Sequence, residues 1–322
     1  MRALTGTERS ATLPSGVELC YREDGDPDGR PLLLIAGLGL DMLIWSDAMV
    51  AALAAEGFRV IRFDNRDAGR TSSSTAKPPG VVGIALGRPR GVTYDLGDMA
   101  ADTIGLLDHL DVTKAHVVGM SMGGMIAQTL AARYPARVAS LTSIFSTTGN
   151  PRVGAPSFKS MALLARPHSK DPVAASHRLL TLSRHIASAG FPFDEGAVRS
   201  RITASAQRAE SVGADPWARV RRQMGAIKVS GDRTTELRRV LAPTLVIHGD
   251  RDVMVNPTGG AATRDAIPGA TMRTIHGMGH DFPSEAVPLL VDLISEHAKR
   301  AESAAEGREK HEEVGEHETR RG

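Results

Sequence analysis

Ser121 stands in a pentapeptide whose spacing is typical of a catalytic nucleophile. Gly119 and Gly123 lie two residues before and two residues after it. An apolar run over 115–118 precedes the pentapeptide, and an Ala- and Leu-rich helical pattern follows it as far as Pro135. Strand, tight turn and helix in this order form a strained bend that exposes a serine hydroxyl, and the glycines leave room for the bend. The sequence therefore predicts that Ser121 is a nucleophile.

A serine hydroxyl needs a base to take its proton and a third group to orient that base. In this architecture the acid and then the base follow the serine along the chain. Asp250 and Asp252 both lie in a loop after the apolar run over 244–248, whereas no acid follows the preceding run over 142–147. We favour Asp252, because the loop must clear the strand end before its carboxylate turns toward the base. Asp250 is then a turn residue.

Two histidines near the C-terminus are candidates for the base. His276 ends the last predicted strand, whereas His280 follows Gly-Met-Gly in a loop before the final helix. A base that reaches the serine from the carboxyl edge of the sheet must lie on that loop, so we assign the base to His280. His276 and His248 are predicted to be structural residues.

Two fixed backbone N–H groups are expected to stabilise the negative charge that develops on a carbonyl oxygen under attack. One belongs to Met122, which directly follows the nucleophile and opens the helix. We assign the other to Leu38, in the Gly-rich loop over 36–41, because Gly37 lets the chain turn and brings the next N–H inward.

Apolar side chains close to these positions predict an apolar acyl pocket. Methionine and leucine are typical of the walls of such pockets. Packing in the core explains the same side chains equally well, and the two interpretations stay open. The residues assigned to the pocket are Leu40, Met42, Met120 and Met125.

The elements that position these residues alternate between strands and helices. The spacing of apolar residues predicts a helix over Asp95–Leu110. Such alternation is typical of an α/β fold with a mostly parallel central sheet flanked by helices. A weak alternation predicts an early strand at 17–22, and 271–275 is predicted to be the last strand. Apolar runs predict the strands between them, at 32–35, 60–63, 115–118, 138–145 and 244–248.

The alternation stops over residues 150–235. Buried-strand patterns are missing there, and short helical patterns are broken at Pro167, Pro172, Pro192 and Pro216. We interpret this segment as a helical cap inserted into a core formed by 1–149 and 236–300. Its arginines favour a solvated helix face, with binding of an acidic substrate group as the weaker alternative; they are Arg208, Arg219, Arg221 and Arg222.

Two further segments are poor in large apolar residues. Residues 72–92 are rich in Ser, Pro and Gly and predict a long surface loop. Residues 301–322 are highly charged, and we interpret them as a disordered tail or a frayed helix extension.

The composition of the 322-residue chain excludes several classes of protein. Its 41% hydrophobic and 24% charged residues are ordinary for a globular protein and too apolar for a disordered one. The formal net charge of +2 gives no overall signal for a nucleic acid or an anionic membrane. The single cysteine, Cys20, excludes an internal disulfide and is predicted to be a small buried strand residue. No apolar run has the length of a signal peptide or a membrane span, so a cytoplasmic protein is expected.

The motifs together resemble the α/β-hydrolase superfamily, over about residues 12–298. Within it, the chain is similar to bacterial esterases of the aclacinomycin methylesterase type and to mycobacterial lipase/esterase-like proteins. One departure is visible, because the usual His-Gly of the oxyanion loop is Ala36-Gly37 here. The motifs that carry the resemblance are Gly119-Met120-Ser121-Met122-Gly123, Gly249-x-x-Asp252, Gly277-Met278-Gly279-His280 and the segment Arg62–Ser72, which resembles the family's structural Asp-x-Arg-x-x-Gly-x-Ser turn.

The resemblance implies a serine hydrolase that cleaves a carboxylic ester or thioester of a small to medium apolar substrate through an acyl-enzyme. It implies no organic cofactor and no metal, and it leaves the oligomeric state open. The alternatives are a cofactor-free perhydrolase or haloperoxidase-type activity on the same triad, and a ligand-binding receptor with a vestigial triad. An intact Ser, Asp and His set argues against the receptor. Dehalogenase and epoxide hydrolase chemistry is excluded because it requires an aspartate at the position of Ser121.

Overall fold

The computed structural model describes residues 6–165, 169, 171–213 and 215–319. Its strands form one sheet in the order β1-β2-β4-β3-β5-β6-β7-β8. β2 pairs antiparallel with β1 and with β4, and all other neighbouring strands are parallel. The strands are β1 (Arg9–Thr12), β2 (Glu18–Asp24), β3 (Arg30–Ile35), β4 (Phe58–Phe63), β5 (Ala115–Met120), β6 (Val138–Ile144), β7 (Thr244–Gly249) and β8 (Thr271–Ile275).

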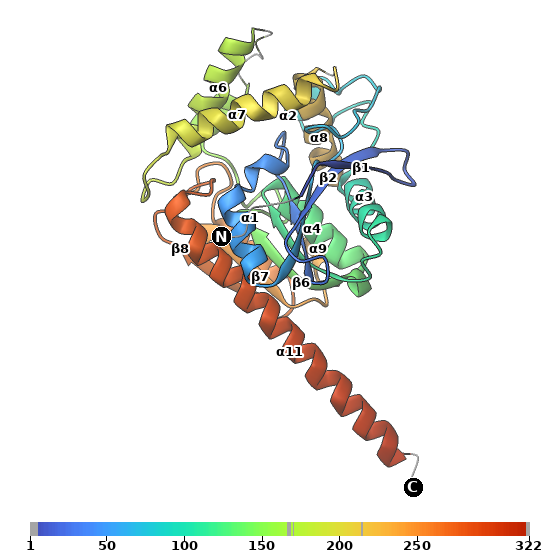
Figure 1. Ribbon diagram of the computed structural model, residues 1–322. Coiled ribbons are helices and arrows are strands. Elements are labelled where there is room, and N and C mark those ends of the chain that lie inside the picture. The colour runs from blue at the N-terminus through green and yellow to red at the C-terminus, as the bar shows by residue number, and fades with distance from the viewer. Residues whose placement is uncertain (1–5, 166–168, 170, 214, 320–322) are drawn as a thin grey trace.

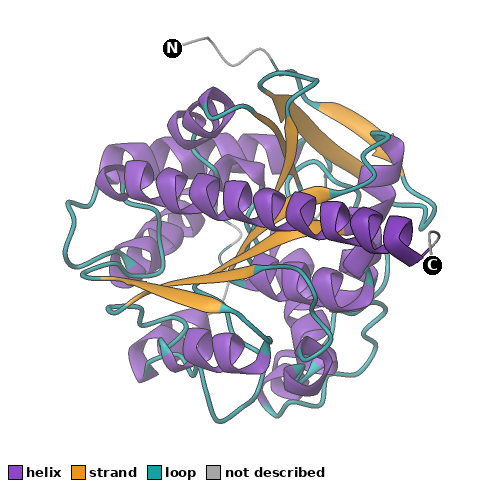
Figure 2. Ribbon diagram, turned by 90° about the horizontal axis from the view of Figure 1, so that it is seen from below, coloured by secondary structure: helices purple, strands orange, loops and turns teal. Residues whose placement is uncertain are grey.

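Helices lie on both sides of the sheet (Figure 2). The α-helices are α1 (Asp47–Ala55), α2 (Val81–Ala85), α3 (Leu96–His109), α4 (Met122–Arg133), α5 (Phe158–Ala165), α6 (Pro172–Ile186), α7 (Glu195–Glu210), α8 (Pro216–Ser230), α9 (Thr234–Leu237), α10 (Thr258–Ala266) and α11 (Val287–Thr319). The 3-10 helices are η1 (Met42–Ile44), η2 (Pro135–Arg137) and η3 (Ser284–Ala286).

The two faces of β3 show why its sequence is a continuous apolar run. Successive strand residues point to opposite faces of a sheet. Leu32 and Leu34 pack in one apolar cluster with α1 and α11, whereas Leu33 and Ile35 pack in another with α3 and α4. Because both faces of a central parallel strand are covered, its sequence does not alternate between apolar and polar residues. The predicted fold class, an α/β fold with a mostly parallel central sheet flanked by helices, is thereby confirmed.

All seven predicted strands are present as β2 to β8, with ends shifted by at most two residues. The predicted helix is α3, and Asp95 is its N-cap, whose carboxylate accepts the N–H groups of Gly97 and Asp98. Cys20 is buried on β2, as predicted. The edge strand β1 was missed because Ala11 is its only buried residue, so it carries no apolar pattern. The predicted surface loop over 72–92 contains the short helix α2.

The segment between β6 and β7 contains α5 to α9 and no strand within its described residues. Pro172 and Pro216 each occupy the first turn of a helix, where a missing N–H is harmless. Pro192 lies between α6 and α7, and Pro167 lies outside the described residues. Figure 1 shows α6 and α7 across one end of the molecule, beyond the strands. The cap boundaries at 150 and 235 stay a prediction.

The C-terminal helix α11 runs into residues 301–322, for which a disordered tail or a frayed helix extension was expected. It continues to Thr319 and extends beyond the rest of the molecule (Figure 1). Its contact with the body passes residue 300, since Glu302 pairs with Arg30 at 3.1 Å and with Nε2 of His116 at 2.9 Å. The strong helix propensity of Ala and Glu accounts for the continuation. None of the described helices combines the length and the apolarity that crossing a bilayer requires.

Three of the arginines expected on a solvated helix face are instead buried against the core. Arg208, Arg219 and Arg222 are between 3% and 7% exposed. Arg208 pairs with the carboxylates of Asp41 at 2.7 Å and Asp64 at 2.8 Å. The prediction of a solvated face is therefore wrong for these three, because each guanidinium has a buried acceptor on the core that the helical pattern cannot reveal.

Replacing Arg208 with methionine should lower the free energy of unfolding by about 3–5 kcal/mol, because it leaves two buried carboxylates without their counter-ion. Burial already raises the pKa of Asp64 against the opposing charge of Arg208. The difference in the free energy of unfolding between the wild type and the variant should therefore become smaller as the pH falls, since a protonated carboxyl needs no counter-ion. Urea denaturation at several pH values measures both effects.

The matched control is Arg199→Met on the same helix. Arg199 pairs with Glu195, and its side chain is 50% exposed, so its loss should cost no more than about 1 kcal/mol. Equal losses in the two variants would contradict a stabilising role for the buried pairs.

Candidate active site

The predicted catalytic residues all follow the carboxyl ends of parallel strands. Leu38 lies after β3, Ser121 after β5, Asp252 after β7 and His280 after β8. Because these strands are parallel, their carboxyl ends meet at one edge of the sheet. Four segments that are distant in the sequence are thus brought to one place.

Ser121 occupies a strained bend between β5 and α4. Its φ of 54° and ψ of −120° lie in a region that side chains rarely adopt. The flanking glycines are required by contact: a Cβ on Gly119 would lie 2.2 Å from the carbonyl oxygen of Gly123, and a Cβ on Gly123 would lie 2.1 Å from that of Ile35. The sequence signature of the bend therefore has a direct steric cause.

The end of β6 holds this bend in place. The N–H of Ser121 donates to the carbonyl of Ile144 at 2.9 Å. The hydroxyl of Ser146 donates to the carbonyl of Ser121 at 2.8 Å. Phe145, which lies between Ile144 and Ser146 in the chain, also has a positive φ of 34°. The centroid of its ring is 4.8 Å from the centroid of the His280 imidazole. The nucleophile and the base thus share one rigid support.

A continuous chain of hydrogen bonds joins Ser121, His280 and Asp252. The Oγ of Ser121 is 3.0 Å from Nε2 of His280. The other ring nitrogen, Nδ1, is 2.7 Å from Oδ2 of Asp252. His280 is 7% exposed and Asp252 is 4% exposed, so the bond between them is buried, whereas the bond to Ser121 is part-buried. The structure brings together the three residues that the sequence predicted.

Asp252 is held on both of its oxygens. Oδ1 accepts the N–H groups of Met254 and Val255, each at 2.8 Å, and Oδ2 also lies 3.3 Å from Nε2 of His248. Burial opposes ionisation, but the charge of His280 and the hydrogen bonds from the two imidazoles outweigh it, so the pKa of Asp252 lies below its ordinary value. The acid is therefore an ionised, fixed acceptor at neutral pH.

The contact of His248 with Asp252 was missed from the sequence. His248 is fully buried and lies four residues before the acid. Its Nε2 is also 2.9 Å from the carbonyl oxygen of Val255, so this nitrogen carries a proton. The residue was predicted to be structural, and only its spacing from Asp252 could have suggested the contact.

The two rejected candidates form a separate pair. Nδ1 of His276 is 2.7 Å from Oδ2 of Asp250, and the N–H of Gly277 donates to Oδ1 of Asp250 at 2.7 Å. The side chain of His276 is 88% exposed. Among the described residues, neither Asp250 nor His276 has a hydrogen bond to Ser121, whose hydroxyl bonds to His280.

The loop that carries Leu38 lies against the nucleophile. A Cβ on Gly37 would be 3.3 Å from Cβ of Ser121. The N–H of Leu38 has no hydrogen-bond partner among the described residues. Met122 is the first residue of α4, so its N–H has no acceptor within that helix. The assignment of these two N–H groups to an oxyanion hole stays a prediction.

The residues predicted for the acyl pocket are mostly packed in the core. Met120 and Met125 belong to the two apolar clusters, Met42 is fully buried, and Leu40 packs against the cluster on the α1 face. Their contact with a substrate stays a prediction.

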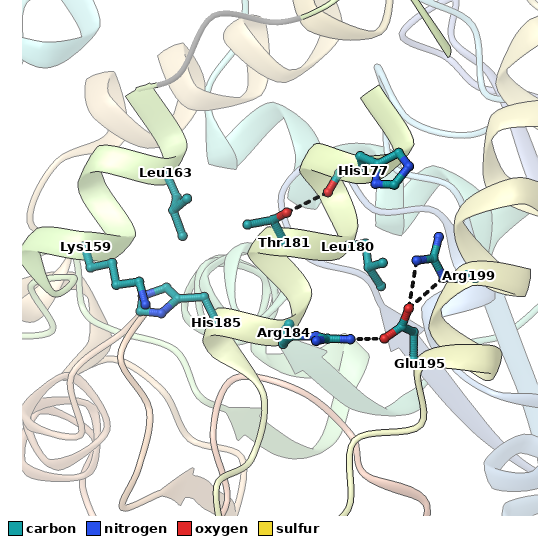
Figure 3. Close-up of a pocket in the computed structure, with 9 residues that line it drawn as sticks. All are labelled: Lys159, Leu163, His177, Leu180, Thr181, Arg184, His185, Glu195 and Arg199. Atoms are coloured by element: carbon teal, nitrogen blue, oxygen red, sulfur yellow. Dashed lines mark hydrogen bonds and ion pairs between the residues drawn. The ribbon is translucent and has the colours of Figure 1, made fainter. Parts of the chain in front are cut away.

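A cavity of about 600 Å³ lies between α5, α6 and α7 (Figure 3). Leu163 and Leu180 form its apolar part, and Glu195 pairs there with Arg184 and Arg199. None of its nine lining residues is one that the sequence predicted for the site. No group of three or more His, Cys, Asp or Glu side chains in the described ranges is placed to hold a metal ion.

Comparison with known proteins identifies the family. The family model described as the alpha/beta hydrolase fold matches residues 30–286. Rhodomycin D methylesterase DauP of Streptomyces sp. strain C5 is 33% identical over 297 residues, which cover 86% of this chain and 93% of that protein. The crystal structure of the esterase RhEst1 from Rhodococcus sp. ECU1013 aligns with a TM-score of 0.66 and 25% identity, over 89% of this chain and 98% of that one. The protein therefore belongs to the α/β-hydrolase fold family.

Proposed function

We propose that this protein is a serine hydrolase that cleaves a carboxylic ester or thioester through an acyl-enzyme on Ser121. The observation that carries the proposal is the hydrogen-bonded chain from Ser121 through His280 to the buried carboxylate of Asp252. Relatives named as a methylesterase and an esterase support the ester as the bond that is cleaved.

Acylation follows from the positions of the three side chains. Nε2 of His280 takes the hydroxyl proton as Oγ of Ser121 bonds to the carbonyl carbon. Asp252 stabilises the imidazolium that forms and keeps its ring in place. The N–H groups of Leu38 and Met122 donate to the oxyanion. His280 then gives the proton to the leaving oxygen or sulfur, and the alcohol or thiol departs.

Deacylation repeats these steps with water as the nucleophile. His280 takes a proton from a water molecule whose oxygen attacks the acyl carbon, and it returns the proton to Oγ of Ser121 as the acid is released. The predicted lining of Leu40, Met42, Met120 and Met125 suits a small to medium apolar acyl group.

Fluorophosphonate labelling tests the proposal. The intact mass should rise by one phosphonyl group, peptide mapping should place the group on Ser121, and esterase activity should fall in proportion to labelling. A panel of p-nitrophenyl esters with acyl chains of graded length then measures the pocket, and the same panel with peroxide measures perhydrolase activity. Full labelling at a residue other than Ser121 with loss of activity would contradict the assigned nucleophile.

A further inference from the structure

Two buried amide side chains hold the loop that carries Leu38. Nδ2 of Asn65 donates to the carbonyl of Ala36 at 2.9 Å. Oε1 of Gln223 accepts the N–H of Gly39 at 2.8 Å. Asn65 is 2% exposed and Gln223 is 0% exposed, so both amide side chains lie in the protein interior. The peptide of Leu38 therefore lies between two points that are fixed from outside the loop.

The loop has little internal means of fixing itself. Its one internal backbone bond joins the N–H of Leu40 to the carbonyl of Gly37 at 3.2 Å. Glycines at 37 and 39 widen the range of backbone angles that the loop can adopt. An oxyanion donor must be aimed before the charge develops, so the outside contacts decide where the N–H of Leu38 points.

Gln223 reaches the loop from α8, 184 residues further along the chain than Gly39. The helix packs directly on the loop, because a Cβ on Gly39, whose φ is +66°, would lie 2.9 Å from Cγ2 of Val220. The second half of the amide is also engaged, since Nε2 of Gln223 donates to the carbonyl of Arg66 at 2.8 Å. The side chain of Gln223 therefore connects Arg66 to Gly39, and bonds at both ends of its amide fix the orientation of that amide.

The neighbouring residues of α8 fix the helix itself. Arg222 donates to both oxygens of Asp67, at 2.8 and 2.9 Å. Arg219 donates to the carbonyl of Thr71 at 2.8 Å. Residues 219, 222 and 223 lie on one face of a helix. These three side chains thus attach that face of α8 to the turn within residues 62–72. Because Gln223 also bonds to Gly39, it links this fixed helix to the loop.

We propose that Gln223 is a positioning residue for the oxyanion donor of Leu38, so that the helical insertion takes part in catalysis through this amide. The inference rests on the proposed function. In it, Gln223 touches neither the substrate nor the reacting atoms and acts only by orienting the loop.

Gln223→Met tests the inference, since methionine has a similar shape and neither hydrogen-bonding group. We expect kcat to fall by about 10²-fold, the loss typical of a reacting group displaced by about 1 Å, with KM little changed. The affinity for a trifluoromethyl ketone, whose adduct on Ser121 carries an oxyanion, should weaken by the same factor. The pH dependence should keep its shape, because the contacts of His280 and Asp252 are untouched.

Gln128→Met is the matched control. Gln128 is also 0% exposed, and its amide bonds to Ser143 and Arg233, each at 2.9 Å. This variant should lose Tm as Gln223→Met does and keep its kcat. Gln223→Glu restores an acceptor for the N–H of Gly39, and its kcat should lie between those of the wild type and Gln223→Met.

Amide hydrogen exchange gives a readout that does not depend on turnover. Exchange over residues 36–42 should be faster in Gln223→Met than in the wild type and in Gln128→Met. Unchanged exchange, or equal losses of kcat in the two methionine variants, would overturn the inference while the proposed function stands. A wild-type protein that neither turns over esters nor labels with a fluorophosphonate would overturn the proposed function, and the inference with it.

Discussion

Ser121→Ala is expected to lower kcat on a short p-nitrophenyl ester by at least about 10³-fold, since removal of the nucleophile leaves only the rate that binding and oxyanion donors provide. The variant should fold normally, because the lost hydroxyl makes one hydrogen bond, to Nε2 of His280. Steady-state kinetics and labelling, compared with the wild type at equal concentration, measure the effect. Retention of most of the activity would refute the mechanism.

The chain contains a matched control for this experiment. Oγ of Ser140 is 2.9 Å from Nδ1 of His116, whose Nε2 is 2.9 Å from Oε1 of Glu302. This is also a Ser–His–acid chain, but Ser140 is on β6 within the sheet, is 2% exposed and lacks a strained bend. Ser140→Ala should therefore leave kcat unchanged. An equal loss in both variants would mean that the effect of Ser121→Ala is a general consequence of removing a buried serine.

The comparison of the two serines shows what made the site predictable. The hydrogen bonds of the two Ser–His–acid chains have similar lengths. Only Ser121, however, has a glycine two residues before it and two residues after it, between a strand and a helix. This pattern involves only neighbouring residues, so it can be recognised in the sequence. Asp252 and His280 were also predictable from local sequence, because each lies in a short loop that follows a predicted strand. Local motifs and apolar periodicity thus predicted the parallel sheet and the chain of hydrogen bonds at its edge.

The contacts made by the insertion were not predictable in this way. Gln223 bonds to a residue 184 positions away, and Ser188 accepts the N–H of Gly279, beside the base, from 91 positions away. The carbonyl of Ile186 likewise accepts the N–H of His280 at 2.8 Å. A buried glutamine or arginine on a helix has the same sequence pattern as a solvated one, and only the folded core shows which acceptor it meets.

Asp252→Asn is expected to lower kcat by about 10⁴-fold, and the hydrogen bonds of this carboxylate give the reason. Oδ1 accepts two backbone N–H groups, whereas Oδ2 accepts from His280 and lies 3.3 Å from Nε2 of His248. An asparagine has a single oxygen and cannot accept on both sides, so when that oxygen accepts the backbone N–H groups, its NH₂ group faces Nδ1 of His280. That nitrogen must then accept, the ring proton moves to Nε2, and the imidazole can no longer take the proton of Ser121.

Asp250→Asn should change kcat little, because Asp250 bonds to the exposed His276 and to the N–H of Gly277 without reaching Ser121. Rates of both variants and the wild type across a pH series measure the difference. The pKa of Asp252 lies below its ordinary value, so its carboxylate stays ionised in mild acid, and protonation of Asp252 should not lower the wild-type rate there. If Asp250→Asn were the more damaging change, the acid would have to be reassigned to the pair at the surface, and the base with it, because each aspartate orients a different histidine.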